Sequence, residues 1–435
     1  MTKKFRIITL GCKVNQYESV YLKEKFTHAG WRQADGGERA DAVIINTCIV
    51  TQRAAHQSRQ EIRKAIRENP GGLVAAIGCY AQVYPDELLR IQGIGLIADN
   101  RAKGKISEVI LGMENSERQL VVLKDFESKM TFDFYPIARY HGRNRAYLKI
   151  QDGCESFCSY CIVAFARGPY RSLVPEKVLS MIESLVREGH KEIVLTGIHL
   201  GKYGVDLNRD TSLNKLLLAI GKEGFPVRIR LSSIEPNEID QDLIEIVAST
   251  EWLCRHFHIP LQSGDNRVLE KMNRHYTAKE FSKLIRTIHD SIPFVAVGID
   301  VMSGFPGEEP IAHRNTRSII KDLPISYLHV FPFSPREGTA AFEFDGRNDP
   351  GVIKKRAADL RAIGEEKRRA FYKVCVGKEF PVLAEGRHSI KKDMMKGTSD
   401  NYLPVLFSSS NDLKGRIVPV RIERIEDNKV FGSPV

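Results

Sequence analysis

Residues 151–161 read Q-D-G-C-E-S-F-C-S-Y-C, and their three cysteines, Cys154, Cys158 and Cys161, have the spacing C-x3-C-x2-C. Thiolate is the usual ligand of iron–sulfur clusters, and three thiolates this close in sequence can hold one 4Fe–4S cluster. The fourth iron of such a cluster has no protein ligand and is open to a substrate. The stretch therefore predicts a cluster that takes part in chemistry, because a fully ligated cluster mostly transfers electrons or supports structure.

Length and composition predict a cytoplasmic protein of two or three domains. The chain has 435 residues, 42% hydrophobic and 27% charged, which is ordinary for a globular protein and too long for a single core. No window contains the roughly 18 apolar residues of a membrane span, and the N-terminus has no export signal. We therefore expect no membrane partner. In the reducing cytosol the eight cysteines favour metal binding or catalysis over disulfides.

The net charge of +11 is compatible with an RNA partner, because basic proteins attract polyanions. The excess is spread along the chain rather than concentrated in a tail. Many basic proteins bind no nucleic acid specifically, so this feature alone is weak.

Strand-like and helix-like patterns alternate in the first segment, residues 1–128. Short apolar runs that alternate with helices predict βαβ units and a parallel sheet. The expected strands are residues 5–10, 42–46 and 72–77, and the expected helices are residues 16–28, 52–68 and 85–90.

A cysteine follows each of these three strands: Cys12, Cys48 and Cys79. The carboxyl ends of parallel strands meet at one edge of a sheet, where ligands bind. The pattern therefore predicts a second site with three thiolates. Zinc is the rival metal for either trio, but structural zinc normally takes four protein ligands, and no fourth ligand is obvious near Cys161.

Residues 140–370 contain six strand candidates, and most are followed by a helical pattern. Six such repeats predict a partial (β/α)6 barrel with its chemistry at the carboxyl ends of the strands. Residues 371–435 have short alternating strands and predict a small β-barrel, either an oligonucleotide-binding module or a plain structural one. The barrel strand candidates are residues 146–151, 192–196, 227–232, 256–261, 295–302 and 326–333.

These motifs resemble those of a known family. The triplet with Tyr160 before its last cysteine is similar to the signature of radical S-adenosylmethionine (SAM) enzymes. The order of the three segments resembles the methylthiotransferases, which have an N-terminal cluster domain, a radical SAM barrel and a C-terminal TRAM domain. Further similar motifs occur in order: T-G-I at 196–198, L-S-S-I-E-P at 231–236, H-I-P-L-Q-S-G-D-N-R-V-L at 258–269, M-N-R at 272–274, G-F-P-G-E at 304–308 and F-P-F-S-P-R-E-G-T at 331–339.

The resemblance implies two 4Fe–4S clusters and SAM as cofactors. SAM would bind the open iron of the cluster on Cys154, Cys158 and Cys161, and one electron from an external donor would cleave it to methionine and a 5′-deoxyadenosyl radical. The second cluster, on the N-terminal trio, would carry sulfur that an external donor supplies. The positions that resemble SAM contacts are Gly197, Ser232, Glu235, His258 and Gln262; their alternatives are helix caps, loop contacts or, for His258, a core histidine.

The first cysteine motif, T-L-G-C-K-V-N-Q-Y-E-S at residues 9–19, is most similar to a subgroup that acts on tRNA. This implies a transferase that adds a methylthio group to carbon 2 of N6-threonylcarbamoyladenosine at position 37, 3′ of the anticodon. The alternatives are isopentenyladenosine in tRNA, a ribosomal-protein aspartate, or a non-catalytic iron–sulfur protein that binds RNA or senses redox state. Ala164 and Glu309 depart from the common family pattern.

Four further residues have an open role. Arg167 and Arg171, just after the triplet, could bind a phosphate or carboxylate, or could be solvated or salt-bridged. A bidentate arginine would suit the threonyl carboxylate, but the sequence does not select one. Cys254 and Cys375 fit neither trio and are expected to be buried apolar cysteines.

Overall fold

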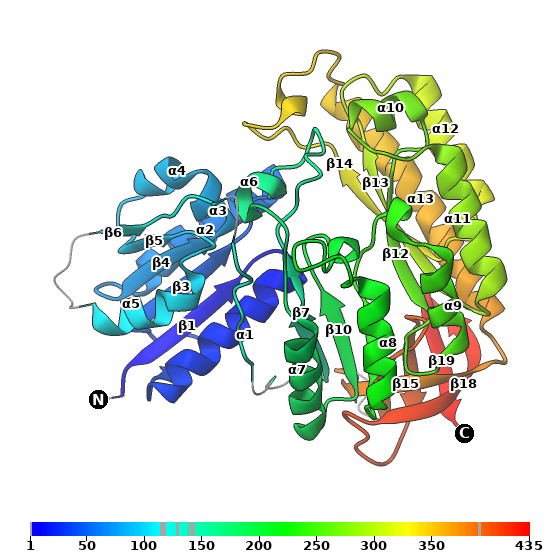
Figure 1. Ribbon diagram of the computed structural model, residues 1–435, viewed down its shortest axis with the longest axis horizontal. Coiled ribbons are helices and arrows are strands. Elements are labelled where there is room, and N and C mark those ends of the chain that lie inside the picture. Colours follow the sequence, from blue (N-terminus) through cyan, green and yellow to red (C-terminus); the bar gives the residue numbers. More distant parts are fainter. Residues whose placement is uncertain (1, 114–118, 128–129, 138–139, 141–143, 390–392) are drawn as a thin grey trace. The chain divides into compact units, whose positions relative to one another are not determined.

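The computed structural model describes residues 2–113, 119–127, 130–137, 140, 144–389 and 393–435. The chain forms two units (Figure 1). Unit 1 comprises Met1–Ala138, Lys149–Leu173 and Ser334–Phe342, and unit 2 comprises Arg139–Leu148, Val174–Phe333 and Glu343–Val435. Residues 128 and 129, where the first predicted segment ends, lie outside the described residues.

Unit 1 is built on a parallel sheet with the strand order β2-β1-β3-β4-β5-β6. Its central strand β3 is buried along its whole length, as expected for a parallel strand covered on both faces. The three expected strands and their helices are present, and three short strands are added to them. The bounds are β1 Lys4–Thr9, β2 Arg32–Gln33, β3 Ala42–Thr47, β4 Leu73–Gly78, β5 Leu96–Ala98, β6 Leu120–Val122, α1 Lys13–His28, α2 Gln52–Glu68, α3 Cys79–Val83, α4 Pro85–Leu89, η1 Lys103–Lys105 and α5 Ile106–Gly112.

The segment with the second cysteine trio also belongs to unit 1. Its ends are held together by an antiparallel pair, β8 (Gln151–Asp152) and β9 (Arg171–Ser172), with the short helix α6 (Val163–Arg167) between them. Gly153 is essential to this closure, because its φ is +79° and an added Cβ would lie 1.8 Å from the carbonyl oxygen of Pro169. The turn therefore requires glycine just before Cys154.

Unit 2 contains the six expected barrel strands, divided between two sheets of order β11-β10-β7 and β12-β13-β14. A bridge between Ser233 and His258 joins the two sheets beyond the end of β11. The predicted α/β fold class with a partial barrel is confirmed. The bounds are β7 Arg145–Lys149, α7 Pro175–Arg187, β10 Glu192–Thr196, η2 Leu200–Lys202, α8 Leu213–Glu223, β11 Arg228–Leu231, η3 Pro236–Glu238, α9 Gln241–Ser249, β12 His256–Gln262, α10 Asn266–Lys271, α11 Ala278–Ser291, β13 Ala296–Ser303, α12 Pro310–Asp322, β14 Tyr327–Pro332 and α13 Pro350–Val374; η4 Ala340–Phe342 belongs to unit 1.

The C-terminal part of unit 2 is a closed barrel of order β15-β16-β17-β19-β18. Closure removes the exposed strand edges that a small sheet would otherwise have. Helix α13 continues to Val374, so the barrel strands begin later than the predicted segment. The bounds are β15 Glu379–Arg387, β16 Met394–Ser399, β17 Pro404–Ser408, β18 Ile417–Glu426 and β19 Lys429–Pro434.

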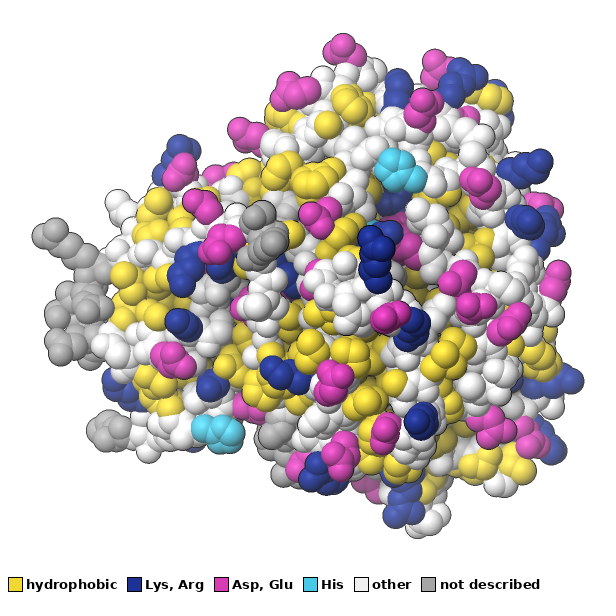
Figure 2. Space-filling view, in the orientation of Figure 1, with side chains coloured by type: hydrophobic (Ala, Val, Ile, Leu, Met, Phe, Trp, Pro, Cys, Tyr) yellow, Lys and Arg dark blue, Asp and Glu magenta, His cyan; other side chains and the backbone are white. Residues whose placement is uncertain are grey.

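Basic and acidic side chains are interspersed on the face of the molecule drawn in Figure 2, with no broad patch of one sign. This agrees with the even spread of charge along the sequence. Within the described residues, no helix is both long enough and apolar enough to cross a membrane.

A buried ion cluster attaches the small barrel to the partial barrel within unit 2. Glu192 is fully buried and pairs with Arg228 at 2.6 Å and Arg230 at 2.9 Å. Burial raises the pKa of Glu192, but Arg230 and Arg228 outweigh it and lower the pKa to about 2. The same arginines donate to carbonyl oxygens of the small barrel, on Pro381, Thr398, Ser399 and Asp400.

Glu192→Gln is expected to destabilise unit 2 by about 3–5 kcal/mol, because it leaves two buried guanidinium groups without a carboxylate. Urea unfolding followed by circular dichroism measures this loss. The exposed pair Arg421–Glu379 supplies a matched control, since Glu379→Gln should cost at most about 1 kcal/mol. Equal losses in the two variants would contradict the structural role of Glu192.

Candidate functional site

The carboxyl ends of β1, β3 and β4 are level, and they bring the first three cysteines to one edge of the sheet. Thr9 pairs with Asn46, and Asn46 pairs with Ile77. Cys48 and Cys79 are buried, whereas Cys12 is exposed. Burial raises the pKa of the Cys48 thiol to about 11, and the neighbouring thiols of Cys79 and Cys12 contribute to this rise. The predicted convergence at one edge is therefore present.

Glycine is required before two of these cysteines. Gly11 and Gly78 have φ values of +96° and +99°, a region that side chains disfavour. A Cβ on Gly11 would lie 2.8 Å from the sulfur of Cys48, and one on Gly78 would lie 2.7 Å from Oδ1 of Asn46. The two Gly-Cys pairs in the sequence, Gly11-Cys12 and Gly78-Cys79, thus reflect close packing around the trio.

The second trio lies on the closed segment of unit 1. The amide of Cys154 donates to the carbonyl of Gly168 at 2.9 Å, and the amide of Cys161 donates to that of Cys158 at 2.9 Å. All three cysteines are partly exposed. Asn100 links the two cysteine-bearing regions, because its side-chain amide lies 3.4 Å from the sulfur of Cys79 and donates to the carbonyl of Ala166 at 2.7 Å.

The cysteines of both trios are thiols, the ligand type that iron–sulfur clusters use. All eight cysteines are described, and none is in a disulfide. Zinc–sulfur bonds of about 2.3 Å place the sulfurs of one zinc ion about 3.8 Å apart. Among the described residues, however, neither trio brings its three ligand atoms within 4.8 Å of one another. Within the described residues, neither trio is thus closed around a single ion.

A buried ion network lies beside the first trio. The Glu18 carboxylate contacts Arg167 at 2.6 Å and Lys149 at 3.4 Å, and it also pairs with Lys103. Burial raises the pKa of Glu18, but these three cations lower it to about 2. Asp152 pairs with Lys149 at 3.0 Å.

Arg167 and Arg171 are both buried in this network. Arg171 lies 3.7 Å from Asp152, and Arg167 also donates to Oδ1 of Asn15 at 2.6 Å. These contacts support the salt-bridged alternative for both arginines. Ion pairs in the network join four cations to two carboxylates: Lys103, Lys149, Arg167 and Arg171 with Glu18 and Asp152. The carboxyl of Asp133 also interacts with Lys149 and Arg171.

The residues that resemble SAM contacts lie in unit 2, at or near the carboxyl ends of three barrel strands. Gly197 follows β10, Ser232 follows β11, and Gln262 ends β12 with a φ of +58°. Ser232 is 7% exposed, and its hydroxyl has no hydrogen-bond partner among the described residues, which leaves it available to a ligand. Burial raises the pKa of Glu235, and its ion pair with Arg274 opposes that rise.

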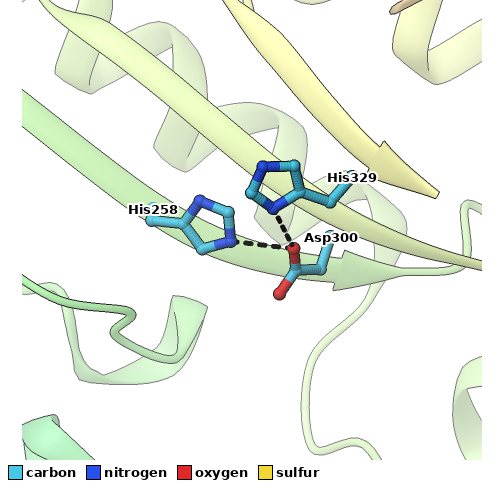
Figure 3. Close-up of side chains that lie close together, drawn as sticks. All are labelled: His258, Asp300 and His329. Atoms are coloured by element: carbon cyan, nitrogen blue, oxygen red, sulfur yellow. Dashed lines mark hydrogen bonds and ion pairs between the residues drawn. The ribbon is translucent and has the colours of Figure 1, made fainter. Parts of the chain in front are cut away.

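His258 lies deeper in the barrel wall, in a hydrogen-bonded cluster (Figure 3). Its Nε2 lies 2.8 Å from Asp300, and its Nδ1 lies 3.1 Å from the hydroxyl of Tyr327. His329, on the next strand, lies 3.2 Å from the same Asp300 oxygen. Two histidines and a carboxylate can bind a metal, but hydrogen bonding to Asp300 accounts for this arrangement. The sequence analysis did not single out Asp300 and His329. Their signal in the sequence is that each is a polar residue with apolar neighbours on its strand, β13 or β14.

Two adjoining cavities in unit 1, of about 960 and 470 Å³, share the side chains of Arg59, Tyr84, Glu87 and Glu337. The larger is also lined by Ile162 and Phe165, just after the second trio. The smaller is lined by Tyr80, next to Cys79. Open space of ligand size therefore lies beside both cysteine-bearing segments.

Three family models match the chain. The model described as uncharacterized protein family UPF0004 matches residues 4–98, that of the radical SAM superfamily matches residues 148–316, and that of the TRAM domain matches residues 373–435. The radical SAM match implies SAM and a 4Fe–4S cluster as cofactors.

Curated relatives match almost the whole chain. A threonylcarbamoyladenosine tRNA methylthiotransferase, MtaB, of Bacillus subtilis is 37% identical over 95% of this chain and 92% of its own length. A tRNA-2-methylthio-N(6)-dimethylallyladenosine synthase of Fusobacterium nucleatum is 32% identical over the full length of both chains. Among solved structures, the radical SAM methyltransferase TsrM of Kitasatospora setae is similar in fold, with a TM-score of 0.57, 16% identity and coverage of 76% of this chain and 73% of its own.

Glu18→Gln is expected to reduce the stability of unit 1 at pH 7, and the loss should shrink in acid. The folded-state pKa of Glu18 is about 2, below the ordinary value of about 4.3. Its stabilising contribution is therefore complete above about pH 4.5 and disappears as the pH falls towards 2. Urea midpoints of wild type and variant at pH 7 and pH 3 test this. A difference that stays constant with pH would contradict the ion-pair role.

Proposed function

This chain belongs to the radical SAM tRNA methylthiotransferases, and we propose that it adds a methylthio group to carbon 2 of N6-threonylcarbamoyladenosine at position 37 of tRNA. The observation that carries the proposal is the presence of two three-cysteine sites in one structural unit, tied together by Asn100. Each site has thiolates for a cluster and no fourth protein thiolate, as substrate-binding clusters require.

The similarity to named relatives favours the threonylcarbamoylated nucleoside. Relatives named for this nucleoside are 32–38% identical, whereas relatives named for dimethylallyladenosine are 29–32% identical. The sequence T-L-G-C-K-V-N-Q around Cys12 supports the same choice. Because the proposed substrate is tRNA, we place the reaction in the cytoplasm. The TRAM domain would bind the phosphates of the tRNA.

In this proposal Cys154, Cys158 and Cys161 hold the cluster that binds SAM, and Cys12, Cys48 and Cys79 hold a second cluster. Bound together, the first cluster and SAM supply the one-electron chemistry that removes the hydrogen from adenine carbon 2, which is not acidic enough for a base to remove. An external electron donor and an external sulfur donor complete the reaction.

The side chains around both sites have defined tasks in this proposal. Asn100 positions Cys79 against the segment of the second trio, and Gly11 and Gly78 allow the first trio to pack closely. Desolvation raises the pKa of the Cys12 thiol, and the nearby guanidinium of Arg167 opposes that rise, which favours the thiolate that a cluster needs. The proposed SAM contacts are Gly197, Ser232, Glu235, His258 and Gln262, with the hydroxyl of Ser232 available to donate or accept a hydrogen bond.

Deletion of the gene should abolish the methylthio form of threonylcarbamoyladenosine in cellular tRNA and leave threonylcarbamoyladenosine itself in place. Mass spectrometry of tRNA nucleosides, with the gene restored as the control, measures the ratio of the two. If the methylthio form of isopentenyladenosine is lost instead, the substrate is isopentenyladenosine and the reaction is the same. An unchanged profile of both nucleosides would refute the proposal.

Replacing one cysteine in each trio should show that the two trios have different functions. The wild type, reconstituted under anaerobic conditions, should contain about eight iron and eight sulfide per chain. Cys158→Ala and Cys48→Ala should each lower both to about four, and only Cys158→Ala should lose cleavage of SAM to 5′-deoxyadenosine. Cys48→Ala should retain that cleavage and lose sulfur insertion.

The buried Cys254 of unit 2 supplies the control for this pair, since Cys254→Ala should keep both clusters. Loss of SAM cleavage to the same degree in Cys48→Ala and Cys158→Ala would contradict the division of labour between the trios.

A further inference from the structure

Arg336 is buried, and no anionic side chain in the described part of the chain pairs with it. Its side chain belongs to the segment Ser334–Phe342 of unit 1, and the residue is 6% exposed. Every other buried arginine of the described chain has a carboxylate partner: Arg167 pairs with Glu18, Arg171 with Asp152, and Arg228 and Arg230 with Glu192. Among the described residues no carboxylate pairs with Arg336, and its Nε has no hydrogen-bond partner.

Burial of a charge without a partner opposes folding, since the ion loses its hydration and gains nothing in return. The guanidinium of Arg336 lies 5.6 Å from the ring centre of Tyr84, and this cation–π contact offsets only part of that cost. A ligand that supplies an anion at this position would offset the remaining cost.

The backbone around Arg336 is held in a fixed position. The hydroxyl of Thr339 donates to the Arg336 carbonyl at 2.7 Å. Gln52 binds the same segment twice, because its amide nitrogen donates to the Ser334 hydroxyl at 2.9 Å and its side chain donates to the Pro335 carbonyl at 3.3 Å. The tyrosine that stacks on Arg336 donates its hydroxyl to the carbonyl of Glu337.

Arg336 lines the cavity of about 470 Å³ in unit 1. One acidic residue of that cavity, Glu87, already accepts hydrogen bonds from Arg59 and Tyr80. The other, Glu337, is exposed and forms no ion pair in the described chain. The cavity therefore offers an anion one buried guanidinium whose hydrogen-bonding capacity is not already used.

The cavity adjoins both cysteine-bearing segments. Its wall includes Tyr80, the residue after Cys79. The segment that carries Arg336 is also hydrogen-bonded to the second trio, because the amide of Ala341 donates at 2.7 Å to the carbonyl of Ser159, between Cys158 and Cys161. An anion bound by Arg336 would thus lie next to the proposed chemistry.

We propose that Arg336 binds an anionic oxygen group of the RNA substrate, either the threonyl carboxylate of the modified base or a phosphate beside it. This inference rests on the proposed function, which supplies the RNA. A guanidinium binds both groups through two parallel N–H donors, and arginine is the side chain best suited to such planar recognition. Arg336 would position the substrate. If it binds the carboxylate, it would also select the threonylcarbamoylated base.

The test compares Arg336→Gln and Arg336→Lys with wild type in binding two tRNAs, one with threonylcarbamoyladenosine and one with unmodified adenosine at position 37. Fluorescence anisotropy gives the dissociation constants. Arg336→Gln should weaken binding of the modified tRNA about tenfold or more, the usual effect of losing a hydrogen bond to a charged group. Arg336→Lys should retain part of the affinity, because it keeps the charge and loses the two-point contact.

The two anion sources give different patterns. If the carboxylate binds, wild type prefers the modified tRNA, and Arg336→Gln removes that preference without affecting the unmodified tRNA. If a phosphate binds, the variant loses affinity for both tRNAs equally. Arg90→Gln is the matched control, because Arg90 is an exposed arginine lining the adjoining larger cavity, and it should change binding by about twofold at most.

Thermal unfolding separates this role from a structural one. Arg336→Gln removes a buried charge without a partner, so its unfolding midpoint should equal or exceed that of wild type, whereas a structural arginine would give a lower midpoint. Wild-type affinity for both tRNAs in Arg336→Gln would overturn the inference and leave the proposed function intact. Failure of wild type to bind either tRNA would overturn the proposed function together with the inference.

Discussion

The buried carboxylate of Glu18 is the interaction on which unit 1 depends. It lies on α1, the helix that begins just after Cys12, and it pairs with cations from three other parts of the chain. Lys103 follows β5, Lys149 ends β7, and Arg167 ends α6. Replacing such a network by apolar side chains often costs no stability, so its value lies in fixing where these segments meet. Through Arg167 and Asn100, the segment of the second trio is held against the sheet edge that carries the first.

The network also changes the electrostatic environment of a thiol beside it. Desolvation raises the pKa of the Cys12 thiol, and the guanidinium of Arg167 opposes that rise. The charged side chains therefore have two roles. They fix where the two cysteine-bearing regions meet, and through Arg167 they favour the thiolate form of Cys12. A purely apolar packing of the same segments would perform only the first.

Sequence patterns predicted the long regular elements and the residues with distinctive chemistry. The strands around residues 42–47 and 73–78 were clear because each is a continuous apolar run, and Cys12, Cys48 and Cys79 could be grouped because parallel strands end together. The strands β2, β5 and β6 were missed because two or three residues carry no readable period. The pairing of Glu18 with Arg167 spans 149 residues, and no local pattern reveals it. For the same reason the sequence could not choose between Arg167 and Arg171, and it did not single out Arg336 within the motif at residues 331–339. Only the positions of distant carboxylates show which arginines have an ion-pair partner.

Unit 1 is discontinuous in the chain, and this has a consequence for its biosynthesis. The residues that complete the wall around Arg336 emerge from the ribosome only after nearly the whole partial barrel has been translated. A nascent chain can therefore form its N-terminal sheet early, yet the anion-binding cavity stays unfinished until Ser334–Phe342 arrives. The chain can therefore bind a ligand at this position only after the strands of the partial barrel have been synthesised.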